Sequence, residues 1–138
     1  MKKPPQCSFF RLIVQTRIHP TESLDKLKDA LRNVIQHSTM NIEKQTLLVG
    51  RSERIDSLVT IYEQVRARQS VSVLRRMLMN NMDGSTTSFL LNKQAAAAGA
   101  VALADTERES PLGAFRVHIQ CDAIQQVIDW LTYAIHKE

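Results

Sequence analysis

Aromatic residues are scarce in this chain of 138 residues, which contains four Phe, two Tyr and one Trp. Proteins that bind single-stranded nucleic acids on a sheet surface usually stack the bases on aromatic side chains. Here only Phe9 lies close to the polar side of a predicted strand, and burial would also suit it. The composition therefore argues against base stacking on single strands and leaves recognition of duplex shape open.

Cysteine and glycine are also sparse, and their low numbers exclude several kinds of binding and catalytic site. Two cysteines, Cys7 and Cys121, cannot form a disulfide framework, and we expect half-buried or buried thiols in a reducing compartment. A bridge between them requires their two strand ends to be neighbours. Four scattered glycines cannot form a glycine-rich phosphate loop, and no histidine or cysteine has the spacing of a zinc site. No nucleophile motif of the GxSxG type is present either. We predict no enzyme, no catalytic residue, no cofactor, no metal and no identifiable small-molecule ligand.

Long apolar runs are also missing. No segment approaches the roughly 20 apolar residues of a membrane helix, and Arg11 and Gln15 interrupt the apolar stretch that follows the basic start MKKPPQ. The sequence therefore predicts a cytoplasmic location without membrane contact. Its length predicts one domain over residues 1–138 with a core of its own.

The basic charge is unevenly distributed. The net charge is +4, and the Lys and Arg excess precedes residue 94, whereas residues 105–138 hold three Lys and Arg against six Asp and Glu. The main polar cluster in the sequence supplies candidate phosphate or RNA contacts, because guanidinium groups bind phosphate oxygens in pairs: Arg51, Arg54, Arg66, Arg68, Arg75, Arg76 and Lys93. The alternative is a solvated helix surface with local ion pairs, and we favour it, because exposed ion pairs on helices are common and contribute little.

Alternation of apolar and polar residues predicts the first and the last strand of the chain. Phe10 to Ile18 is the first strand, and Phe115 to Cys121 is the last. The polar positions of these two strands share one side of the predicted sheet. They form a second candidate contact surface with nucleic acid: Arg11, Arg17, Arg116 and His118.

Helices are predicted between the strands. Thr21 is placed to cap the first helix, Ser52 the second, and Asp122, paired with Gln125, the last. The last helix has a core stripe that includes Ile124, Val127, Ile128, Leu131 and Ile135. A single second strand is expected over Ile42 to Val49, closed by Gly50.

The predicted third helix has too many apolar residues for one stripe. It begins at Ser70 and ends at Asp83-Gly84, and glycine suits the left-handed residue past a helix end. We expect this helix to be buried on two sides, by this chain or by a partner. The candidate surface for a homodimer consists of Val73, Met77, Met79 and Met82.

The remaining strands lie in the last third of the chain. Thr86 to Leu91 is a strand, Asn92 to Gly99 a short helical insert, and Ala100 to Ala104 a further strand. A type I turn at Ser110–Gly113 is expected to join that strand to Phe115–Cys121 as a hairpin. The order β-α-β-α-α-β-β-β-α predicts an α+β fold, a mainly antiparallel sheet with helices packed on one face.

Four segments carry a resemblance to a known family. They are TRIHPTES (Thr16–Ser23), LLVGRSERIDSL (Leu47–Leu58), FLLNKQA (Phe89–Ala95), and ESPLGAF with IDWL (Glu109–Phe115 and Ile128–Leu131). The chain resembles an uncharacterised archaeal protein family, number two hundred and one in the UPF series. The resemblance implies a fold similar to that of ribosomal protein L-five, an RNA-binding protein, and brings no catalytic residues.

Two functions follow from these observations. The favoured hypothesis is a non-enzymatic interaction or structural module that acts as a homo-oligomer, because the third helix has an excess of apolar surface. The alternative is an RNA-binding accessory domain that contacts phosphates through its arginines.

Overall fold

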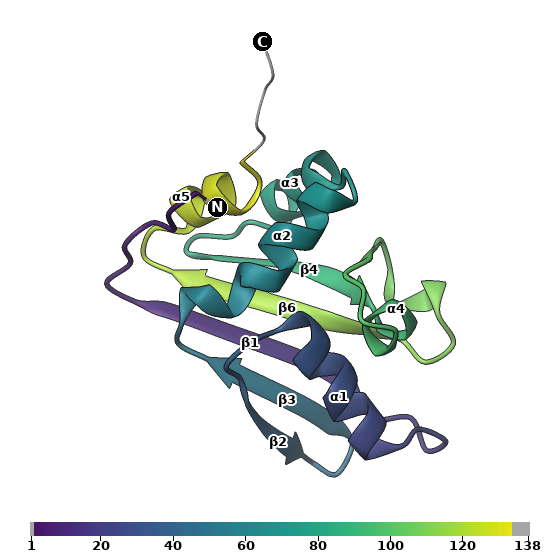
Figure 1. Ribbon diagram of the computed structural model, residues 1–138. Coiled ribbons are helices and arrows are strands. Elements are labelled where there is room, and N and C mark those ends of the chain that lie inside the picture. Colours follow the sequence, from purple (N-terminus) through teal and green to yellow (C-terminus); the bar gives the residue numbers. More distant parts are fainter. Residues whose placement is uncertain (1, 134–138) are drawn as a thin grey trace.

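The computed structural model describes residues 2–133 and is organised around a six-stranded sheet in the order β2-β3-β1-β6-β4-β5 (Figure 1). All strand pairs are antiparallel. The strands are β1 (Phe10–Arg17), β2 (Thr39–Glu43), β3 (Leu47–Ser52), β4 (Thr86–Asn92), β5 (Leu103–Ala104) and β6 (Ala114–Cys121). The helices are α1 (Leu24–Val34), α2 (Val59–Ala67), α3 (Val71–Asn80), α4 (Lys93–Ala97) and α5 (Ile124–Leu131), with 3₁₀ turns η1 (Ile55–Leu58) and η2 (Glu107–Glu109). The predicted α+β class is confirmed.

The central strand β1 shows why the sequence forms a two-sided sheet. Leu12, Val14 and Thr16 are buried, whereas the residues between them point to the other side. β1 pairs with β3 and with β6, so Val14 lies between Gly50 and Val117 in the core. Figure 1 shows α1 and α2 lying over the same side of the sheet. The other side carries Arg11, Gln15 and Arg17 of β1, together with Ile13.

Gly50 lies inside β3 and does not end a strand, so that part of the prediction is wrong. A Cβ atom added at Gly50 would come within 3.0 Å of Leu31 Cδ2, which belongs to a fully buried side chain of α1. A Cβ at this position would require the Leu31 side chain to shift, so glycine allows α1 to pack closely on β3.

One predicted strand is in fact a hairpin. The turn Glu43–Thr46 joins β2 to β3, with the Thr46 amide donating to the Glu43 carbonyl at 3.1 Å. Its central residues Lys44 and Gln45 have φ angles of 53° and 60°. Glycine and asparagine usually fill such left-handed positions, so the sequence contained no turn signal.

The helix caps differ from those predicted. Ser23, not Thr21, caps α1 by accepting from the Lys26 amide, and Thr21 instead bonds the ring of His19. Ser52 belongs to β3, where its hydroxyl bonds that of Ser57 at 2.6 Å. The predicted starting point of α3 is confirmed, since Ser70 occupies its N-cap position, although its side chain makes no capping bond.

Within the described residues, one side of α3 is covered by the rest of the chain. Leu74 and Leu78 are fully buried, and Val71, Met77 and Met82 pack partly against the same core. The expected burial of α3 on two sides is therefore not provided within residues 2–133.

The segment after β4 is partly as predicted. Asn92 caps α4 by accepting from the Ala95 amide at 2.9 Å. The turn at Ser110–Gly113 is closed by a bond from the Gly113 amide to the Ser110 carbonyl. The expected hairpin between β5 and β6 is wrong, because β5 pairs with β4 and β6 pairs with β1 and β4. Residues 105–113 therefore form a loop that crosses from one edge of the sheet toward its middle.

Asp122 does not cap α5. Its carboxylate accepts from the amides of Ser8 and Phe9, and Ala123 occupies the N-cap position without a side-chain bond. Within α5 the predicted core stripe is buried, and Trp130 is buried with it. Ile135 lies outside the described residues. Among the helices of residues 2–133, none is long and apolar enough to cross a bilayer.

A candidate nucleic-acid interface on the open face of the sheet

The side of the sheet that the helices leave uncovered is called the open face below. Strand register places on it Arg11, Ile13, Gln15 and Arg17 of β1, Val49 and Arg51 of β3, and Arg116, His118 and Gln120 of β6. Alternation alone predicted Arg11, Arg17, Arg116 and His118 there, and the register agrees. Arg51, predicted as part of the helix-associated cluster, also joins this face because it pairs with Ile13.

The register places charged groups of different strands on the same face, with uncharged side chains of β1 between them. Gln15 lies opposite Arg116, and Ile13 lies between Arg51 and His118. Arg11 and Arg17 are exposed near the two ends of β1. Directly opposed residues of neighbouring strands have Cβ atoms about 5 Å apart. The open face therefore presents guanidinium groups from three adjacent strands.

A groove of about 660 Å³ runs along this face where the loop 105–113 rises beside β1 and β6. Arg17, Arg108 and Arg116 line it, together with His19 and Gln15. Arg108 was not predicted as a contact, because only the loop's position in the fold brings it here.

A second groove, of about 630 Å³, lies on the other side of the same loop. Arg108 and Arg116 line this groove too, and Arg76 of α3 joins them with Asn80 and Asn81. Arg76 is thus a second member of the predicted arginine cluster that lies near the open face.

Ion pairs orient some of these arginines. Glu107 of η2 accepts from Arg116 Nη2 at 2.7 Å, and Glu43 of β2 pairs with Arg51. Both pairs are largely solvent-exposed, where such pairs stabilise the fold by little. The two carboxylates hold the guanidinium groups in place, and phosphate oxygens could replace them at small cost.

His118 lies among these groups and is half-buried. Burial lowers the pKa of His118, and the charge of Arg116 lowers it further. The imidazole is consequently neutral near pH 7, and it can gain a proton where a bound anion compensates for these two effects.

Phe9 adds an aromatic ring at the end of this face. It is 41% exposed, and the Arg11 guanidinium lies 5.2 Å from the centre of its ring. The ring is therefore not buried in the core. One such ring does not make a stacking platform of the kind that binds single strands.

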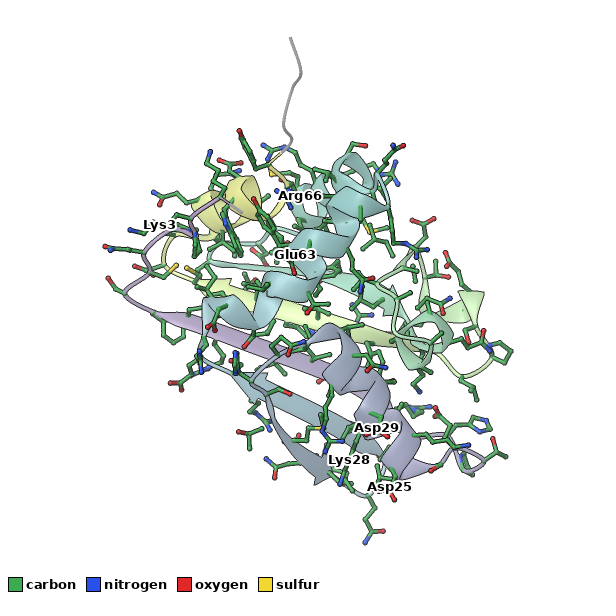
Figure 2. All side chains as sticks on the ribbon, viewed as in Figure 1. Lys3, Asp25, Lys28, Asp29, Glu63 and Arg66 are labelled. Atoms are coloured by element: carbon green, nitrogen blue, oxygen red, sulfur yellow. The ribbon has the colours of Figure 1, made fainter. Side chains whose placement is uncertain are left out.

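The other predicted arginines belong to the helical layer. Figure 2 shows Arg66 on α2 beside α5, and its guanidinium donates to the carbonyls of Tyr62, Trp130 and Leu131. Arg75 bonds Asp129 of α5 at 2.8 Å, and Arg54 makes a two-bond pair with Asp56. Arg68 is exposed at the end of α2. The predicted cluster is thus divided between two sides of the molecule.

Lys93 is not a surface contact at all. It is 3% exposed, and its ammonium group bonds the carbonyls of Arg17 and Leu112 and the carboxylate of Glu22. The NKQA segment therefore has a structural role: it fastens β1, α4 and the turn before β6 together.

The predicted dimer surface is smaller than expected. Val73, Met77 and Met82 are half-buried, and Met79 is 38% exposed, with its sulfur near the Gln125 amide. Most of the apolar excess of α3 is used by the core of this chain.

Comparison with known proteins assigns the chain to a class. Residues 11–122, which include nearly all of the six strands, match the family model described as RNA binding. The chain is 34% identical over 125 residues to the UPF0201 protein of Sulfurisphaera tokodaii and 35% identical to that of Sulfolobus acidocaldarius, in each case over 88% of this chain and 86% of the relative.

The chain belongs to the UPF0201 family. The crystal structure of the UPF0201 protein from Methanococcus jannaschii superposes with a TM-score of 0.79 at 26% identity, covering 91% of this chain and 95% of that one. The family resemblance predicted from the four sequence segments is confirmed. The similarity to ribosomal protein L-five stays a prediction.

Proposed function

We propose that the open face binds structured RNA by contacting its phosphate backbone. The observation that carries the proposal is the convergence of Arg17, Arg108 and Arg116 on one groove, with Arg11 and Arg51 on the same face. The family model described as RNA binding spans these strands and supports the same conclusion. The proposal concerns a binding function and not an enzyme.

The chemistry of the face favours backbone contacts over base readout. Guanidinium groups recognise phosphate in pairs of hydrogen bonds, whereas base stacking needs several exposed rings and Phe9 is the one near this face. Helical RNA is recognised mostly by its shape and its phosphates and 2′-hydroxyls. A structured RNA with a duplex segment is therefore the expected ligand.

Paired substitutions on the two sides of the molecule test the proposal. We expect Arg17→Ala with Arg116→Ala to weaken RNA binding by about 100-fold or more, because hydrogen bonds to charged groups contribute roughly 1.5–3 kcal/mol each. The slope of log K against log salt should flatten by about 0.7 to 0.9 for each phosphate that the protein no longer neutralises. Fluorescence anisotropy with a labelled RNA hairpin at several salt concentrations measures both quantities.

The matched control is Arg68→Ala with Arg75→Ala, which removes two arginines from the helical layer. Affinity should stay within about twofold of the wild type, because exposed charges there are far from the groove. A larger loss of affinity in the control than in the sheet variant would show that the RNA binds the helical layer instead of the open face. Wild-type binding that vanishes at physiological salt would overturn the proposal itself.

The lowered pKa of His118 predicts a pH dependence of binding. Phosphate beside the imidazole stabilises its charged form, so the complex takes up a proton and affinity rises as the pH falls below the ordinary pKa of histidine. The size of the gain equals the factor by which the bound anion raises the proton affinity of the imidazole. His118→Gln should abolish this part of the dependence. His37→Gln, at a position that faces Asp56, should retain it; an unchanged pH profile in His118→Gln would contradict the prediction.

We propose, as an independent property, a homodimer contact through Val73 and Met79 of α3. Met79 is the exposed large apolar side chain of this helix, which supports the proposal. Light scattering at micromolar concentration should give twice the mass of the chain, and Met79→Glu should give a monomer. A wild-type protein that is monomeric at this concentration would contradict the proposed dimer.

A further inference from the structure

The two cysteines of the chain meet where the N-terminal segment reaches the end of β6. Their sulfur atoms lie 2.9 Å apart, although the residues are 114 positions apart in sequence. Cys121 is buried and Cys7 is half-buried. The condition set by the sequence, that the two strand ends be neighbours, is therefore fulfilled.

Groups other than the sulfurs hold this arrangement in place. The Asp122 carboxylate accepts from the amides of Ser8 at 3.2 Å and Phe9 at 3.0 Å, which fixes the backbone directly after Cys7. Phe10 pairs with Cys121 in the β1–β6 ladder. The two thiols are consequently positioned by the fold and do not depend on a bond between them.

We propose that Cys7 and Cys121 are a redox-active pair that forms an intramolecular disulfide. The oxidant is a low-molecular-weight disulfide, RSSR. The more accessible Cys7 loses its proton, and its thiolate attacks one sulfur of RSSR and releases RS⁻. The thiolate of Cys121 then attacks the Cys7 sulfur of this mixed disulfide and releases the second RS⁻. The protein sulfurs lose two electrons, and two RSH form once the thiolates take up the two protons.

The surroundings favour the oxidised form of the pair. Burial raises the pKa of Cys7 to about 12, and the contact with Cys121 contributes to this rise. Disulfides that are easily reduced are those whose reduced form is stabilised, typically as a thiolate. Because burial, Cys121 and Asp122 all disfavour a thiolate at Cys7, the disulfide should resist small thiols once formed, and its formation at neutral pH should be slow.

A bound metal is the alternative for the same three groups. The two sulfurs and a carboxylate oxygen of Asp122 all lie within 4.8 Å of one another. A structural zinc site needs four ligands, and the Asp122 carboxylate already accepts two backbone amides. The residues therefore suit a sulfur–sulfur bond better than a metal ion.

The bond would fasten an N-terminal strap, residues 2–9, to the sheet. The strap already touches the helical layer: the Lys2 amide donates to the Tyr62 hydroxyl, and the Trp130 indole donates to the Lys2 carbonyl. A disulfide would close a loop that contains nearly the whole chain and would thus restrict the unfolded state strongly. This inference does not depend on RNA binding.

The experiment compares reduced protein with protein incubated with oxidised glutathione. We expect the oxidised protein to lose the mass of two hydrogen atoms, to resist alkylation by iodoacetamide after denaturation, and to run as a single chain on denaturing, non-reducing gels. Its Tm should exceed that of the reduced protein by on the order of 10 °C. Cys7→Ser and Cys121→Ser should show none of these changes.

Three results would overturn the inference. One is alkylation of both cysteines after oxidation, and another is a cross-link between two chains. The third is stoichiometric Zn²⁺ binding that is lost in both Cys7→Ser and Asp122→Asn, without any disulfide in metal-free protein. Because the reduced forms of wild type and Cys7→Ser are compared at the same time, a simple folding defect in the variant is recognised by its lower reduced Tm.

Discussion

Lys93→Met is expected to lower the free energy of unfolding by about 3–5 kcal/mol, because it removes one member of a buried ion pair. The ammonium group bonds Glu22 at 3.0 Å, the Arg17 carbonyl at 2.8 Å and the Leu112 carbonyl at 2.9 Å. Methionine fills similar space but satisfies none of these acceptors. The Glu22 carboxylate would keep only the amide of His19 among these contacts.

Thermal or urea unfolding measures this effect, which should appear as a Tm lower by about 10–20 °C. Lys26→Met, at an exposed position of α1, is the matched control and should stay within about 0.5 kcal/mol of the wild type. Adding Glu22→Gln to Lys93→Met should recover part of the loss, since no unpaired buried charge then remains. If the free energy of unfolding of Lys93→Met alone lies within about 1 kcal/mol of the wild-type value, the ion pair contributes little to stability.

Arg66→Met is expected to lower the free energy of unfolding by roughly 2–4 kcal/mol, because the guanidinium closes the C-terminal end of α5. It donates to the carbonyls of Trp130, Leu131 and Tyr133, and it lies 3.4 Å from the centre of the Tyr62 ring. Tyr62 in turn stacks on Trp130. Partial burial lowers the pKa of Arg66, yet a guanidinium stays charged at any pH used for the measurement.

Two further variants test whether the loss of stability in Arg66→Met comes from the planar guanidinium group. Arg66→Lys keeps the charge but loses the planar fork, and it should show most of the loss in stability. Arg68→Met, two residues away and exposed, should show almost none. RNA affinity of folded Arg66→Met should equal that of the wild type. A weaker affinity would return Arg66 to the group of phosphate contacts.

Alternation and turn residues were sufficient for most of the fold. The strands β1 and β6 follow from strict alternation, and the Asn92 cap follows from residue type. The hairpin at Lys44 and Gln45 was missed because neither residue is typical of left-handed turns. The partner of β5 was wrong because a turn motif indicates a reversal of the chain but not the strand with which the next segment pairs.

The functional residues were predictable where a strand determined the direction of the side chain. Arg11, Arg17, Arg116 and His118 share a face because period two imposes it. Proximity in sequence misled for Arg66 and Arg75, whose partners come from the distant helix α5. The burial of Lys93 had no signal either, since its three acceptors come from three separate segments.

The strand order has a consequence for the assembly of the chain during synthesis. β1, β2 and β3 pair among themselves, and β4 pairs with β5, but these two groups are joined through β6 alone. A nascent chain that ends before Ala114 therefore has two separate sheet fragments, each with an unpaired edge. Contacts between the beginning and the end of a chain slow folding. The order β2-β3-β1-β6-β4-β5 thus delays closure of the sheet until β6 has been translated.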